Sequence, residues 1–176
     1  LSATEEVIND QAIVFSGHLA GYILTQYETI REKGSFEAYE DNFLQFRFDP
    51  DNSNWNFIGH TYTGSRVYLY YRARKYSKKS AFVLSFLSSL WFETIIENYT
   101  EPPSIQDVFN TPIFGSALGY GIEEYSMKLL KSKNKTTRIV GRLLNPFSLL
   151  VEDENITFIP SVNKEGYKFM VTMTYD

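Results

Sequence analysis

Two apolar stretches in the middle of the chain dominate its hydrophobic pattern. Residues 81–92 and residues 108–122 contain no charged side chain, and Pro102 and Pro103 lie between them. Both runs are longer than an ordinary strand and can be covered on nearly all sides, so they predict two buried helices. Because helical backbone is disfavoured before a proline, the two helices are expected to meet at a short break and form a central helical hairpin.

Capping signals place the ends of these two arms. Ser80 is expected to cap the first arm, and Ser104 followed by Asp107 is a close variant of a capping box at the start of the second. Pro112 should kink or break the second arm early. Neither apolar run reaches the roughly 18 to 20 residues of a membrane-spanning helix.

Further helices are predicted on the N-terminal side. Ser2 or Thr4 can cap a helix that runs to about Lys33, where Gly34 ends it. Residues 60–76 predict another helix, rich in Tyr and Arg. Ordinary packing is the first interpretation of these side chains, a membrane interface the second and nucleic acid a distant third.

Paired small residues predict close helix crossings. Gly17 and Gly21 lie four apart in the first helix, and Gly115 and Gly119 repeat this spacing in the second arm of the hairpin. A face without Cβ atoms lets another helix approach closely. Phosphate binding by the second glycine pair is the sharper alternative, but the Lys and Ser or Thr of a phosphate-binding loop are missing.

The remaining segments favour extended structure. Residues 42–48 alternate apolar and polar side chains, and residues 156–175 read as a β-hairpin. The predicted fold class is therefore mainly α: a helical bundle around a central helical hairpin, with a small C-terminal β-hairpin. Residues 1–151 are expected to form the helical domain, and residues 152–176 an appendage or the start of a β-rich part.

Composition narrows the chemistry. The chain has no Cys, which excludes disulfides, thiolate metal sites and a cysteine nucleophile. Of the two histidines, His18 is expected to be a hydrogen-bonded core residue. Two histidines are too few for a His-based metal site unless carboxylates supply the remaining ligands. The sequence therefore predicts no metal and no cofactor.

Charge is divided along the chain. Residues 59–151 hold twelve basic and six acidic side chains, whereas the net charge of the whole chain is -4. One interpretation of the basic middle is that it binds anionic lipid headgroups or another polyanion. The other is that its basic side chains lie at the solvated C-terminal ends of helices, where Lys and Arg are favoured. The expected partners are a membrane surface or an envelope protein, with no nucleic acid, and the oligomeric state is not predicted.

The acidic residues between the two apolar arms are the best place for a site. An enzymatic interpretation makes His60 a general base oriented by Glu93 or Asp107, because a carboxylate between apolar helices has a raised pKa. The preferred interpretation is structural: these carboxylates cap helices and pair with arginines, so no catalytic residue is assigned. The candidate binding residues are Tyr62, Arg66, Glu101 and Ser104, and the candidate arginine partners are Arg66, Arg72 and Arg74.

Residues 49–121 resemble a known family. The resemblance is carried by DNSNWNFIGHTYTG, by SLWFETIIE and most specifically by EPPSIQDVFNTPIFGSALG. These motifs are similar to those of the bacterial DUF3943 family, a domain of unknown function. The resemblance implies an exported protein in the periplasm or outer membrane of a Gram-negative bacterium, and it implies no established activity. The resulting hypothesis is a non-enzymatic structural or binding module close to a membrane; the alternative is an envelope hydrolase acting on lipid or glycan.

Overall fold

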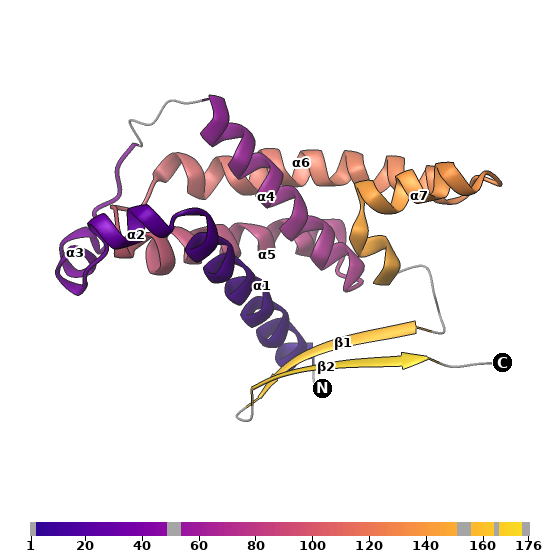
Figure 1. Ribbon diagram of the computed structural model, residues 1–176, viewed down its shortest axis with the longest axis horizontal. Coiled ribbons are helices and arrows are strands. Elements are labelled where there is room, and N and C mark those ends of the chain that lie inside the picture. The colour runs from indigo at the N-terminus through magenta and orange to yellow at the C-terminus, as the bar shows by residue number, and fades with distance from the viewer. Residues whose placement is uncertain (1–2, 49–53, 151–155, 164–165, 174–176) are drawn as a thin grey trace.

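The structure is a computed structural model that describes residues 3–48, 54–150, 156–163 and 166–173. Its helices follow in chain order, with a π-helix η1 and two short 3-10 helices η2 and η3. Their bounds are α1 (Ala3–Thr25), α2 (Tyr27–Lys33), α3 (Phe36–Asn42), α4 (Asn54–Ala73), α5 (Lys78–Trp91), η1 (Phe92–Ile96), η2 (Glu97–Tyr99), α6 (Ile105–Leu130), α7 (Lys135–Leu144) and η3 (Pro146–Leu150). Figure 1 shows α5 and α6 side by side, with α4 crossing them.

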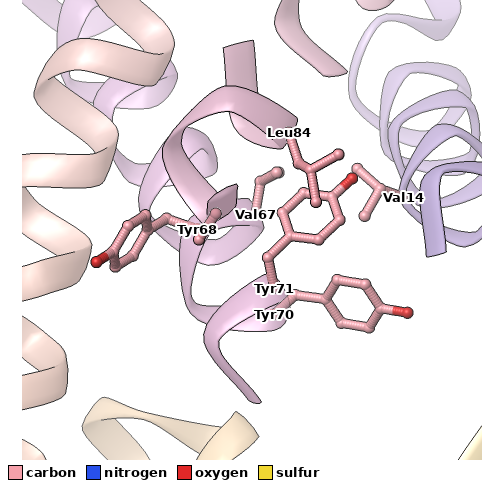
Figure 2. Packing of buried hydrophobic residues seen from close by; sticks show 7 residues of the cluster. Val14, Val67, Tyr68, Tyr70, Tyr71 and Leu84 are labelled. Carbon is pink, nitrogen blue, oxygen red and sulfur yellow. The ribbon is translucent and has the colours of Figure 1, made fainter. Parts of the chain in front are cut away.

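Helix α4 lies at the centre of this arrangement. Five consecutive residues, Val67 to Tyr71, are buried, so neighbours cover the helix on every side over more than one turn. In Figure 2, Tyr71 points between Leu84 of α5 and Val14 of α1, while Tyr68 points to the opposite side of α4. Tyr68, Tyr70 and Tyr71 are therefore packing residues, as the first interpretation of the sequence had it, whereas Tyr62 is 54% exposed.

Backbone contact joins α4 to α6. A Cβ added at Gly64 would lie 2.1 Å from the carbonyl oxygen of Thr111, and one added at Gly115 would lie 2.6 Å from the backbone of Gly64. Gly119 also lies close to α4, where an added Cβ would meet a ring carbon of Tyr68 at 2.8 Å. Only glycine fits such a crossing, so the predicted close approach at Gly115 and Gly119 is confirmed.

The other glycine pair does not behave in this way. Nothing lies within 4 Å of a Cβ added at Gly17 or Gly21. Helix α1 makes its contacts through different residues, and the crossing predicted at this pair is wrong. The spacing of two glycines indicates a smooth face but does not identify the element that covers it.

A buried carboxylate anchors α1 to α4. Asp10 is 1% exposed. Its Oδ1 accepts hydrogen bonds from the Tyr70 hydroxyl at 2.8 Å and from Arg74 Nε at 2.9 Å, and its Oδ2 accepts one from the Tyr76 hydroxyl at 2.9 Å. This ion pair with two tyrosine donors satisfies the desolvated charge.

The predicted fold class is wrong in its organisation. Helices α5 and α6 are not covered on nearly all sides, and the helix that others surround is α4, so the central helical hairpin is not the core. Within residues 3–48 and 54–149 the regular structure is entirely helical, and its core draws on helices alone. A C-terminal β-hairpin is therefore not supported as a component of the packed fold.

Two segments beyond the helices are extended. The backbone of β1 (Ile156–Asn163) pairs antiparallel with that of β2 (Gly166–Met173), with Ile156 opposite Met173, and β1 runs past α1 (Figure 1). Two strands alone are marginally stable. The domain boundary predicted at residues 151 and 152 lies outside the described residues.

Several predicted helix ends also need correction. The first helix ends at Thr25, and α2 follows after Gln26; Gly34 then caps α2. Helix α5 begins after Ser77, whose side chain accepts the backbone N–H of Ser80, so Ser80 is not the cap. Residues 36–42 form a short helix that Ser35 caps, and the predicted extended piece at residues 42–48 is reduced to a single bridge at Arg47.

Helix α6 continues through its proline. Pro112 lies inside an uninterrupted α-helix of 26 residues, so the predicted break is absent from it. Pro112 is buried beside the α4 crossing, and packing against α4 offsets the lost backbone hydrogen bond.

Candidate functional site

The start of α6 is fixed by a capping arrangement that the sequence predicted. Ser104 is the N-cap, and its hydroxyl oxygen accepts the backbone N–H of Asp107 at 3.2 Å. The backbone N–H of Ser104 in turn donates to Glu93 Oε2 at 2.9 Å. These two bonds hold both carboxylates at the break between α5 and α6.

Glu93 lies in a π-helical turn. Residues Phe92–Ile96 form η1, and Glu93 is 1% exposed within it. A π-turn inserts one residue into a helix and often marks a functional position. The other oxygen of this carboxyl group, Oε1, is buried, and the carboxyl group of Glu97 interacts with Glu93 there.

His60 reaches the same point from α4. Its Nδ1 lies 3.0 Å from Thr111 Oγ1 on α6, and its Nε2 lies 3.9 Å from Asp107 Oδ2. One donor atom from each of His60, Glu93 and Asp107 lies within 4.8 Å of the others. Three elements distant in sequence therefore bring an imidazole and two carboxyl groups together.

These groups line a polar cavity of about 160 Å³. Arg47 is also at its wall, where its Nη2 pairs with Glu101 Oε2 at 2.9 Å. The main chain of Arg47 braces the same wall, since its N–H donates to Pro103 and its carbonyl accepts from Ile105. The complete lining is Tyr22, Gln26, Thr29, Lys33, Arg47, His60, Glu93, Glu97, Glu101, Pro102, Ser104 and Asp107.

Burial controls the protonation of Glu93. Desolvation, followed by the negative charge of Glu97, raises the pKa of Glu93 to about 10, and the backbone N–H of Ser104 opposes the rise. Asp107 raises it further. A raised pKa favours the protonated form of the Glu93 carboxyl group, which can donate a hydrogen bond or a proton.

A second cavity, of about 470 Å³, shares the imidazole of His60 with the first and contains His18 in its wall. The ring of His18 packs edge-on against Phe92, with 5.4 Å between ring centroids. Burial, and secondarily the charge of His60, lowers the pKa of His18 to about 4.

The depressed pKa of His18 predicts a loss of stability in acid. The unfolded chain takes up a proton near pH 6.5 and the folded chain only near pH 4, so stability is full above pH 6.5 and falls as the pH drops towards 4. The contribution of this residue is at most about 1.4 kcal/mol per pH unit. Urea unfolding at pH 7 and pH 5 should show a smaller loss for His18→Asn than for the wild type; equal losses would contradict the assignment.

The candidate binding residues divide into two groups. Glu101 and Ser104 line the cavity with His60, whereas Tyr62 and Arg66 lie away from it. The Arg66 guanidinium stacks over the Tyr62 ring at 4.4 Å and donates to the Leu144 carbonyl at 2.7 Å, which attaches α4 to the end of α7.

The arginine partners differ from those expected. Arg72 pairs with Glu123, and Arg74 pairs with Asp10, so neither neutralises the carboxylates at the break. The arginine that does approach them is Arg47, which sequence reasoning missed. Its position within alternating aromatic residues was the available signal, but the bridge to Ser104 depends on a backbone pairing that no local pattern encodes.

Comparison with known families decides the classification. The family described as "Domain of unknown function (DUF3943)" matches residues 45–147, which is more than half of the chain. The chain belongs to this family. The matched part of this DUF3943 protein contains His60, Glu93 and Asp107, together with the whole of α4, α5 and α6. No curated protein and no solved structure matches the chain significantly.

Proposed function

We propose that this DUF3943 protein is a non-enzymatic binding module that lies at a membrane of the envelope of a Gram-negative bacterium. The observation that supports the proposal is the distribution of side chains in α5 and α6, which is the reverse of that in a helix of a water-soluble protein. Their inward faces are rich in small and polar residues, and their outward faces carry large apolar ones. Such a distribution is typical of helices that contact lipid.

The outward face of α5 is a continuous apolar row. The exposed residues recur about once per turn at Phe82, Val83, Leu87 and Trp91, and Ile95 in η1 continues the row. On the inward face, Ser85, Ser88 and Ser89 are buried, and Ser89 Oγ donates to the carbonyl of Asp107 at 3.0 Å. Polar groups therefore hold the helices together where a soluble protein would place aliphatic side chains.

Helix α6 extends this surface. Phe109 on α6 meets Phe86 on α5 with 5.4 Å between ring centroids, so the two rows adjoin. The exposed apolar residues of α6 are Phe109, Ile113, Phe114, Leu118, Tyr120 and Tyr125. Contiguous apolar surface of this kind marks an interaction site, whereas single exposed apolar residues do not.

Basic residues follow the apolar rows. The last turn of α6 and the segment after it carry Lys128, Lys131, Lys133, Lys135, Arg138 and Arg142. An apolar face beside a basic cluster suits the boundary between acyl chains and anionic headgroups. Among the described residues, the helical segment Lys78–Tyr99 has the length and composition of a membrane-crossing helix, which is weak evidence when it stands alone.

Vesicle flotation tests the proposal. The purified chain should float with phosphatidylglycerol-containing vesicles. A Leu87→Glu, Leu118→Glu double variant should bind at least about tenfold less, because burial of each leucine in the membrane contributes roughly 1.5–3 kcal/mol. The matched control is Thr25→Glu with Gln45→Glu, which adds the same charge at exposed polar positions. A wild-type chain that stays monomeric without detergent and ignores the vesicles would contradict the proposal.

A hydrolase remains the second candidate because of one observation. His60 Nε2 lies 3.9 Å from Asp107 Oδ2 at the wall of a polar cavity, where a general base would be placed. Hydrogen bonds of catalytic groups are often long before substrate binds. Turnover of a lipid or glycan substrate by the wild type but not by His60→Asn would favour this candidate over the binding module.

A further inference from the structure

His60 and Glu93 are each fixed by a hydrogen bond at one side-chain atom, which leaves the second nitrogen or oxygen of the side chain available to a ligand. The His60 Nδ1 is engaged with Thr111 Oγ1 at 3.0 Å, which leaves Nε2 facing Asp107. Glu93 accepts the Ser104 N–H through Oε2, while the other polar side chain that interacts with its carboxyl group is a second acid, Glu97. Buried acidic groups that face one another are costly to ionise, so their retention beside a polar cavity favours a cationic ligand.

We propose that His60, Glu93 and Asp107 bind one divalent transition-metal cation, for which Zn²⁺ is the probe. Imidazole nitrogen with carboxylate oxygen is a donor set that zinc accepts, whereas Mg²⁺ and Ca²⁺ prefer oxygen alone. The sequence predicted no metal because two histidines were too few without carboxylates. The structure places the carboxyl groups of Glu93 and Asp107 next to one of these histidines, His60.

The separations fit such an ion. Two donors at about 2.1 Å from a tetrahedral zinc ion stand about 3.4 Å apart. The His60 Nε2 and Asp107 Oδ2 atoms are 3.9 Å apart, and the three donor atoms all lie within 4.8 Å of one another. Side-chain rotations that bring the donor atoms roughly 0.5 to 1.4 Å closer together therefore complete the site, and positions on the cavity side stay open to water.

The surroundings supply orientation and charge. Metal-bound histidines usually donate the other ring N–H to a fixed acceptor, and Thr111 is placed for this role. The cavity wall carries four carboxyl groups, from Glu93, Glu97, Glu101 and Asp107, against the two cationic groups of Lys33 and Arg47. Such an excess of acidic groups favours a cation over an anion or a neutral ligand.

Calorimetric titration tests the site. Chelator-treated protein in detergent should bind one equivalent of Zn²⁺, and His60→Asn, Glu93→Gln and Asp107→Asn should each weaken binding at least about tenfold. Thr111→Val should weaken it by about tenfold and Thr111→Ser should restore it, because only the hydroxyl orients the ring. The matched control is Glu124→Gln, which removes an exposed carboxylate on the same helix as Asp107 and should leave the affinity unchanged.

A second measurement separates loss of ligands from loss of fold. Zn²⁺ should shift the NMR resonance of the His60 Nε2 in the wild type, and each variant should retain its helical circular dichroism. Absence of Zn²⁺ binding by the folded wild type would overturn the proposal. Full affinity in a folded His60→Asn variant would do the same.

Discussion

Replacement of Gly115 by alanine is expected to destabilise the domain by about 3 kcal/mol, at the upper end of what overpacking costs. The added Cβ would lie 2.6 Å from the backbone of Gly64 and 2.8 Å from the amide nitrogen of Ser65. Neither neighbour is a flexible side chain, so α4 and α6 must separate along the most extensive helix contact of the fold. The change in the free energy of unfolding can be measured by urea denaturation in mild detergent.

The same helix offers a matched control. A Cβ at Gly121 meets nothing within 4 Å, so Gly121→Ala should gain up to about 1 kcal/mol from its better helix propensity. The two substitutions are chemically identical, and only the neighbouring backbone differs. If Gly115→Ala were as stable as Gly121→Ala, the close crossing of α4 and α6 would be refuted.

Asp10→Asn should be the second strongly destabilising change, with a loss of about 3 kcal/mol. Asp10 accepts three hydrogen bonds, one of them from the charged Arg74. Asparagine removes the charge that neutralises this arginine and turns an NH₂ group towards a hydroxyl donor. Thermal unfolding followed by circular dichroism should show the lower melting temperature.

An exposed ion pair supplies the comparison for Asp10. Glu28 pairs with Arg31 at 3.4 Å, and both side chains are more than half exposed. Glu28→Gln should therefore change stability by less than about 0.5 kcal/mol. Equal losses from the two substitutions would mean that the network around Asp10 contributes no more than a surface contact.

Sequence reasoning recovered the helices better than their packing. The run without charges at residues 81–92 does form helix. Four of its large apolar side chains, Phe82, Val83, Leu87 and Trp91, are exposed, whereas Leu84 is buried together with the serines at positions 85, 88 and 89. Composition alone cannot distinguish a row of apolar residues that faces a core from one that faces outward. The centre of the fold was assigned to the wrong helix for that reason.

The candidate site could be predicted in part because its residues have local signatures. Asp107 was identified from a capping pattern, and Glu93 from its place beside an apolar run. The part of the cavity wall that Tyr22 and Arg47 contribute could not be found in this way. It depends on the tertiary packing of α1 and on the backbone bridge between Arg47 and Ser104, which place these residues beside the break between α5 and α6. Long-range pairing of this kind leaves no periodic trace in the chain.

Because of the π-helical turn at Phe92–Ile96, the geometry of the cavity depends on the number of residues in this segment as much as on their types. An α-helix advances by about 100° per residue, so deletion of one residue there would rotate everything that follows relative to α5. The Glu93 side chain would then lose its alignment with the Ser104 amide, which the main chain of Arg47 holds in place. Related chains that keep this arrangement should tolerate substitution along α5 far more readily than any insertion or deletion between Trp91 and Ser104.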